Sequence, residues 1–343
     1  MDASNIESFN AAAMEAVNAM PAPTWHRLRV NNEKIALPSG LEPSSDIELS
    51  IDNIELGESG AFDSALSTFQ QKLDARNEGT VDTRAVVVAA AGNENPENLD
   101  IPALSSYQRK AVLEEIENSV SKAFETGMGT EAFAYLESVS DGHLVLVAPE
   151  KAVGSATVRI SAKDGMANAA CVDVVAAPHS NVSLTISFEG SSRGSGFAGC
   201  GLRVFAGVGA EVEVSSIQAL DGCWTVFDDS GYALDDDAHV AVTHRVLGAD
   251  SASTGLSADL RGNQSRIDVV TRYLGAEKQK IDFNYSIKQR GCLTESNLDA
   301  NGVLAGESKK TLRGTIDFVH GCKGSTGNER ETVLLADKNV VNK

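Results

Sequence analysis

Two cysteines and a histidine near the carboxyl-terminal end of the sequence have the residue types of a site for iron or sulfide. Cys292 and Cys322 lie 30 residues apart, and His320 lies two residues before Cys322. If the chain repeats as stacked strands at about this interval, the two thiols lie on neighbouring turns about 5 Å apart. Thiolate and imidazole are ligands that iron accepts. Because free cysteine often serves as a small buried apolar side chain, a pair of core residues remains the alternative.

The cysteines as a set argue against structural disulfides and zinc. The chain has five cysteines, an odd number, and no CxxC pair. Neither a secreted disulfide framework nor a zinc module fits that pattern. We therefore expect reduced thiols at Cys171, Cys200, Cys223, Cys292 and Cys322.

Three glycine-rich segments contain the letters of nucleotide-binding or catalytic motifs without their context. Gly194–Gly199 matches G-x-G-x-x-G, but strand-like residues 202–205 follow it where a phosphate-binding helix is needed. The overlapping G-x-S-x-G around Ser192 fails for the same reason. In Gly321–Ser325 a glycine separates the lysine from the serine of a phosphate loop. We therefore assign no nucleotide site and no catalytic activity to the chain.

An acidic cluster lies in residues 228–237. It consists of Asp228, Asp229, Asp235, Asp236 and Asp237. Carboxylates in a turn can bind calcium, but the spacing of an EF-hand loop is absent. We expect a solvated loop that carries part of the negative charge.

The charge balance limits the classes of partner. With 48 acidic and 29 basic residues the net charge is −19, which repels nucleic acid and anionic lipid. The first residues lack the basic and apolar regions of a signal peptide, and no run of about 18 apolar residues occurs. These features predict a cytoplasmic protein with neither a nucleic-acid nor a membrane partner.

A repeated alternation predicts the fold of residues 151–343. Apolar residues alternate with mostly polar ones in three segments that follow one another at a fixed interval. The matching triplets are Val182, Leu184 and Ile186, then Ala210, Val212 and Val214, then Ala238, Val240 and Val242. A period-two strand that recurs at a fixed interval is typical of a solenoid whose turns stack on one another. We expect a mainly β protein with a β-helix core over residues 151–343.

The first 150 residues have a mixed pattern that predicts a smaller α/β cap. Helices are expected over residues 5–19, 62–73, 105–125 and 131–139, and strands over residues 47–54, 84–90 and 143–147. Pro21 and Pro23 follow the first of these helices and end it. The chain is thus expected to consist of a cap, residues 1–150, and a core, residues 151–343.

Residues 265–343 are similar to one known family. The segments Ile281–Tyr285, Gly302–Leu304, Leu312–Phe318 and Asn328–Asp337 follow in the order seen in the SufB/SufD scaffold of the SUF iron–sulfur cluster assembly system. Near the start, Pro23–Leu28 resembles the amino-terminal region of that family. The resemblance implies a right-handed β-helix core, in agreement with the repeat.

Arg330 makes the chain more similar to SufD than to SufB. The SufB-type scaffold carries an essential cysteine just after a glutamate of this strand, and here Arg330 follows Glu329. A permanent cation cannot bind iron or carry persulfide sulfur. The resemblance implies a non-catalytic SufD-like subunit that pairs with a SufB-like subunit and a SufC-type ATPase. It implies no tightly bound cofactor, but iron or a cluster that passes transiently through a subunit interface, with Cys292, His320 and Cys322 as candidate contacts.

The sequence ends at Lys343, before the His-Gly-Ala motif and the carboxyl-terminal helical domain of that family. We expect both to be absent and the last turn to be open. An open turn favours association through its strands. The partner surface is therefore expected on residues 281–337, in a heterodimer or in a homodimer.

Two other functions remain open. Carbohydrate-active enzymes also use a β-helix, and they need charged groups that converge on a groove, for which residues 228–237 are the only candidate. The third alternative is a purely architectural protein that binds no metal.

Overall fold

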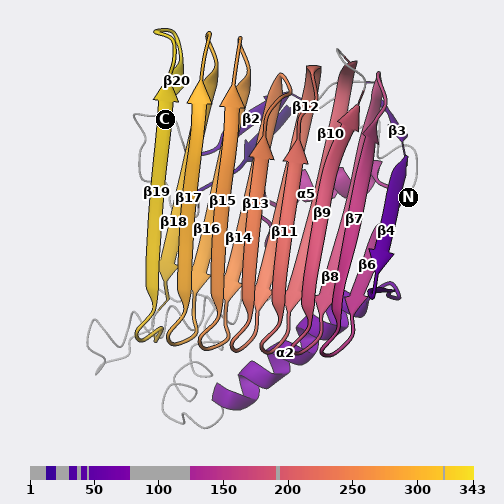
Figure 1. The fold of residues 1–343 in the computed structure, drawn as a ribbon, viewed down its shortest axis with the longest axis vertical. Coiled ribbons are helices and arrows are strands. Elements are labelled where there is room, and N and C mark those ends of the chain that lie inside the picture. The colour runs from indigo at the N-terminus through magenta and orange to yellow at the C-terminus, as the bar shows by residue number, and fades with distance from the viewer. Residues whose placement is uncertain are drawn as a thin grey trace, which may run out of the picture.

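Two long β-sheets form the body of the protein in a computed structural model (Figure 1). The structure describes residues 13–20, 31–36, 40–44, 46–77, 124–190, 194–319 and 321–343. The ten-stranded sheet contains β3 (Glu42–Ser44), β5 (Glu55–Leu56), β6 (His143–Ala148), β8 (Met166–Ala176), β10 (Gly194–Ala206), β12 (Gly222–Leu234), β14 (Ser251–Leu260), β16 (Lys280–Gln289), β18 (Lys309–Phe318) and β20 (Val341–Asn342). The eight-stranded sheet contains β4 (Ile47–Asp52), β7 (Val153–Ala162), β9 (Asn181–Gly190), β11 (Glu211–Gln218), β13 (His239–Val246), β15 (Arg266–Gly275), β17 (Glu295–Leu304) and β19 (Thr326–Leu335).

Consecutive strands alternate between the two sheets, so each pair from β6–β7 to β18–β19 makes one turn of a solenoid. The described chain contains seven such turns. Within each sheet, a strand of one turn pairs in parallel with the corresponding strand of the next turn. Parallel pairing between turns distinguishes this arrangement from an antiparallel sandwich. The prediction of a mainly β protein with a solenoid core is confirmed.

The two sheets differ in how their strands are buried. In the eight-stranded sheet, β9, β11 and β13 alternate between exposed or half-buried and buried residues, because only one face lies on the core. In the ten-stranded sheet, β14 and β16 are buried along most of their length on both faces. The core between the sheets is one continuous cluster of Val, Leu, Ile, Ala and aromatic side chains.

The stacking interval varies from turn to turn instead of staying fixed. Val182 pairs with Val212, Val212 with Val240 and Val240 with Ile267, so the interval falls from 30 to 27 residues over these turns, and it lengthens again in the turns that follow. The prediction that Val182 stacks on Ala210 is therefore wrong by two positions. Because side chains alternate with period two, a shift of two positions leaves the same residues facing the core. The predicted inward face was right in all three segments, and the predicted register was right from Val212 to Val240 but not from Val182 to Val212.

Segments near the amino terminus cover one face of the solenoid. Two helices, α2 (Ala61–Asn77) and α5 (Thr130–Val139), and the hairpin β1 (Ala13–Val17)–β2 (Glu33–Ala36) lie behind the ten-stranded sheet (Figure 1). Tyr135 of α5 packs edge-on against Phe197, with ring centroids 4.8 Å apart. Asn18 Nδ2 donates to Asp282 Oδ1 at 2.6 Å. β4 and β5 pair antiparallel with β7 and β6. The boundary at residue 150 stays a prediction.

The helix expected over residues 5–19 is wrong where the structure describes it. Residues 13–17 form β1, which pairs antiparallel with β2, so sheet pairing overrides the helix propensity of the alanines. The predicted helices over 62–73 and 131–139 and the strands over 47–54 and 143–147 are confirmed by α2, α5, β4 and β6. The strand over 84–90 and residues 105–123 of the third helix lie outside the described residues; Phe124 and Glu125 are not helical.

No helix in the described ranges is long and apolar enough to span a bilayer.

Candidate functional site

The two thiols lie in adjacent corners of the solenoid. Cys292 belongs to the corner between β16 and β17, and Cys322 to the corner between β18 and β19. Leu293 has a left-handed backbone, with φ of 59°, and its N–H donates to the Lys323 carbonyl oxygen at 2.8 Å. Such bonds repeat from corner to corner: the Gln264 N–H donates to the Cys292 carbonyl oxygen at 2.8 Å. The expected stacking of the two thiol-bearing segments is therefore present.

The two cysteines are diagonal neighbours. Glu295 pairs with Thr326, and continuing that register toward the corner places Cys322 opposite Gly291, one position from Cys292. The Cys292 thiol reaches across and donates to the Gly321 carbonyl oxygen at 3.5 Å. Both side chains are half-buried, and partial burial, with the nearby Cys292, raises the pKa of the Cys322 thiol.

The donor set around the thiols is small. His320, the third predicted contact, lies outside the described residues. Among the residues that are described, no three His, Cys, Asp or Glu side chains gather in a group that could hold a metal ion. Of the residues described at these corners, the two thiols supply the soft ligands, and a complete iron site would need further donors.

The other three cysteines have different environments. Cys171 and Cys200 are fully buried, and burial raises the pKa of Cys171 to about 12 and that of Cys200 well above its ordinary value. Both are inert members of the core. Cys223 is exposed. None of the five thiols takes part in a disulfide in this structure.

The glycine-rich segments are structural. Gly194–Ala206 is the single strand β10, so no helix follows the G-x-G-x-x-G pattern. A Cβ on Gly194 would lie 2.6 Å from the Trp224 ring, which explains glycine at this position. Gly321–Ser325 forms the corner between β18 and β19. Ser192 lies outside the described residues.

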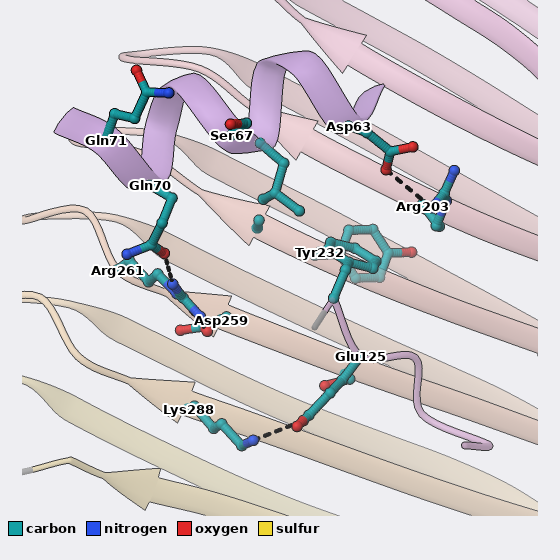
Figure 2. A pocket seen from close by; sticks show the side chains of 14 residues that line it. Asp63, Ser67, Gln70, Gln71, Glu125, Arg203, Tyr232, Asp259, Arg261 and Lys288 are labelled. Atoms are coloured by element: carbon teal, nitrogen blue, oxygen red, sulfur yellow. Dashed lines mark hydrogen bonds and ion pairs between the residues drawn. The ribbon is translucent and has the colours of Figure 1, made fainter. Parts of the chain in front are cut away.

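A cavity of about 540 Å³ lies between α2 and the outer face of the ten-stranded sheet (Figure 2). Ion pairs and hydrogen bonds link its walls: Arg203 contacts Asp63 at 3.5 Å, Lys288 donates to Glu125 at 2.7 Å, and Arg261 donates to Gln70. Small side chains such as Ala233 and Ser257 form part of its floor. Its charged groups attach the amino-terminal segments to the solenoid. Sequence reasoning missed it because its walls come from distant parts of the chain.

Comparison with known families decides the assignment. The family model described as SUF system FeS cluster assembly, SufBD core domain, matches residues 158–343, more than half of the 343-residue chain. The chain belongs to the SufBD core family. It therefore has a role in SUF iron–sulfur cluster assembly, in a family whose members are generally non-catalytic assembly subunits. None of the curated proteins compared with the chain matches it.

Within this SufBD core, Arg330 lies on the outer face of the last described strand of the eight-stranded sheet. Its register partner on β17 is Asp299. The Arg330 Nε donates to Asp299 Oδ1 at 3.2 Å, and 69% of the arginine side chain is exposed. A guanidinium at this position can hold a carboxylate but offers no soft ligand.

Three of the five carboxylates in the acidic cluster of the SufBD core do not lie in the solvated loop that we expected. Asp228, Asp229 and Asp235 are buried. Asp228 accepts from Ser216 Oγ at 2.6 Å, and Asp235 accepts from Lys72 Nζ at 2.6 Å. Asp229 accepts from the Met128 N–H at 2.8 Å, and burial raises its pKa to about 7. For these three carboxylates the expectation is wrong, because Asp228 faces the core between the sheets while distant segments bind Asp229 and Asp235, and none of the three is available in a surface groove. Asp237 is exposed, as expected.

Polar side chains also line the interior of the SufBD core, which the sequence analysis missed. His244 is fully buried and stacks on Tyr285, with ring centroids 5.8 Å apart. The Tyr285 hydroxyl lies 2.7 Å from Thr271 Oγ1 and 3.3 Å from His244 Nδ1. Burial lowers the pKa of His244, so the ring is neutral at physiological pH. Ser216, His244 and Thr271 occupy successive turns in register, and this column of polar residues at inward positions was the available signal.

His143 connects α5 to the solenoid. Its Nε2 lies 2.9 Å from Glu137 of α5, and its Nδ1 lies 3.1 Å from Asp173 of β8. Arg203 holds the same Asp173 through Nε and Nη2 at 2.7 and 2.6 Å. Only the protonated ring can donate to both carboxylates. The bond to Asp173 raises the pKa of His143, against burial and Arg203, which lower it.

We expect the attachment of α5 to weaken as pH rises. The pKa of His143 is higher in the folded chain than the ordinary value of about 6.5, so its contribution is complete below that pH and is lost above it as the folded protein titrates. Once the observed rates are divided by the intrinsic exchange rate at each pH, the protection of the α5 amides should fall between pH 6 and 8.5 by a factor equivalent to at most about 1 kcal/mol. His143→Gln should remove this dependence, whereas His239→Gln, at a more exposed pair with Asp268, should leave it intact. An equal pH response in the His143 variant would contradict this role.

Proposed function

We propose that the chain is a SufD-like subunit that pairs with a SufB-like subunit and a SufC-type ATPase in the cytoplasm. The observation that supports this assignment is Arg330, which stands where a SufB-type scaffold needs a thiol and pairs with Asp299 at the surface. Such a subunit is non-catalytic, and ATP hydrolysis belongs to the partner. Iron or the cluster is cargo that passes the subunit interface.

The thiol corner is proposed as the point where this subunit contacts the cargo. Cys292 and Cys322 are the half-buried thiols among the five, and they lie in adjacent corners. His320, the next residue but one before Cys322 in the sequence, is proposed with them on sequence grounds. The soft character of the thiolates suits iron and sulfide.

The partner surface is proposed on residues 281–337. Large apolar side chains that are exposed in the described chain include Leu293, Phe318, Leu334 and Leu335, all in this range. Leu335 occupies an inward register position opposite Leu304 and is nevertheless 53% exposed. A strand of a partner that continues the eight-stranded sheet would cover it.

We expect Leu335→Asp to weaken binding to a SufB-like subunit at least tenfold, because it places a charge in an apolar contact. Leu247→Asp is the matched control, since Leu247 is 46% exposed outside this range. Co-expression with both partners, followed by titration of the purified subunits, measures the change. Equal affinity of the two variants would exclude this surface.

Cluster assembly tests the thiol corner separately. In the complex with both partners, Cys292→Ser and Cys322→Ser should each lower the yield of anaerobic cluster reconstitution several-fold. Cys223→Ser, at an exposed thiol elsewhere, should not. An unchanged yield in both corner variants would remove these thiols from the assembly reaction, and a complex that never forms would overturn the SufD-like assignment.

A further inference from the structure

Cys292 and Cys322 lie at a backbone separation that a disulfide can span. Neighbouring strands lie about 4.8 Å apart, and one residue along a strand advances the chain by about 3.3 Å. Diagonal neighbours such as Cys292 and Cys322 therefore have Cα atoms about 6 Å apart, inside the range of disulfides. The Cys292 thiol already contacts the carbonyl oxygen of Gly321, whose peptide bond leads into Cys322.

We propose that Cys292 and Cys322 form a reversible dithiol–disulfide pair that links the corners of two successive turns. As a means of regulation, the pair rests on the proposed function of the site. Formation of the disulfide itself depends only on the geometry of this chain and requires neither iron nor a partner. Oxidation would consume both thiols at once, so that neither could contact iron or receive sulfur. Oxidation would therefore block the site, and reduction would restore it.

The chemistry is a pair of thiol–disulfide exchanges with a small-molecule disulfide as oxidant. One thiolate attacks the small disulfide, forms a mixed disulfide and releases one small thiol. The second cysteine, as its thiolate, attacks the bonded sulfur of the first, forms the protein disulfide and releases the second small thiol. The protein loses two electrons and two protons, and the oxidant becomes two thiols. Partly exposed disulfides of this kind are typically labile, so a dithiol reductant should reverse the bond.

The environment of the five thiols makes the pair distinguishable from single cysteines. Cys171 and Cys200 are fully buried and should not react in the folded protein. Cys223 is exposed and should react as a lone thiol. A lone thiol that reacts with a symmetrical small disulfide keeps one half of that molecule as a mixed disulfide. Two thiols that go on to form a disulfide with each other keep neither half.

The test treats the folded chain without metal or partners with 4,4′-dithiodipyridine and maps the products by peptide mass spectrometry. We expect a Cys292–Cys322 bridge that lacks two hydrogens, with two equivalents of thiopyridone released from this pair, and a retained pyridyl adduct on Cys223. In Cys292→Ser and in Cys322→Ser the remaining corner thiol should keep its adduct. Cys223→Ser should form the bridge as wild type does.

Two results would overturn the proposal: separate adducts retained on Cys292 and Cys322 in the wild-type chain, or no reaction at either thiol. Mass spectrometry detects both results in the chain alone, with no cluster assembly. If the bridge is absent but the serine variants still lower cluster yield, the proposed function stands and only the redox pair fails. If the bridge forms and the cluster yield is unaffected, the redox pair stands without the cargo contact.

Discussion

Replacement of Trp224 by alanine should lower the free energy of unfolding by about 3–5 kcal/mol. Trp224 is fully buried at the start of β12 and belongs to the continuous core between the sheets. Glycines at 194 and 196 leave room for its ring, since a Cβ there would lie 2.6 and 3.1 Å from it. These glycines have no side chain that could extend into the space that alanine would leave. Urea titration followed by circular dichroism measures the loss.

Two variants show whether packing is the cause. Trp224→Phe keeps most of the apolar volume and removes an indole N–H that has no partner among the described residues, so it should cost less than about 1.5 kcal/mol. Leu247→Ala, at a side chain that is 46% exposed, should change stability by no more than about 0.5 kcal/mol. If the alanine variant at 224 were as mild as the one at 247, tight packing at this turn would be disproved.

Arg313→Met should cost about 3–5 kcal/mol, because it leaves a buried carboxylate without its cation. The Arg313 Nη1 lies 2.5 Å from Asp282 Oδ1, and the two side chains are 3% and 6% exposed. Glu33 lies close to the same carboxylate; burial and Asp282 raise its pKa to about 9, while Arg313 lowers it. Without the guanidinium, Glu33 should stay protonated to higher pH and the hairpin β1–β2 should be held less firmly. Chemical denaturation and hydrogen exchange of β1 and β2 report the two effects.

Arg330→Met is the matched control on the opposite sheet. Arg330 also pairs with an aspartate, but 69% of its side chain is exposed, and exposed pairs contribute about 0–1 kcal/mol. The ratio of the decreases in the free energy of unfolding of the two variants therefore measures how much burial increases the stabilisation of an aspartate by its arginine. A loss at Arg313 no larger than that at Arg330 would show that Asp282 is solvated in the folded protein.

The solenoid could be predicted because its signal is local and repeated. Alternation in β9, β11 and β13 identified the face that meets the core, and an error of two positions in the interval did not change that face. The exact register could not be read from the sequence, since corners of different length absorb the difference. The strand β1 was missed because its partner β2 supplies the hydrogen bonds that a helix would otherwise make within residues 13–17.

The candidate site was only partly predictable for the same reason. Cys292 and Cys322 were placed in neighbouring turns by their spacing, but their diagonal position depends on how β17 pairs with β19, which no local pattern reveals. The burial of Asp229 depends on Met128, which is distant in sequence. The interior contact of His244 with Tyr285 joins opposite sheets. Composition and spacing cannot predict contacts of this kind, which depend on how distant segments pack.

Described helices and a hairpin cover the ten-stranded sheet but not the eight-stranded sheet, so the two faces of the solenoid differ in accessibility. A protein that approached the ten-stranded sheet would first have to displace α2, α5 and the hairpin, together with the ion pairs that fasten them (Figures 1 and 2). On the eight-stranded sheet no described helix lies, and an incoming protein would meet rows of alternating side chains such as Ser183 and Glu213 without displacing any described element. Surface changes on that side can therefore accumulate with little effect on folding, which leaves it free to diversify toward different neighbours.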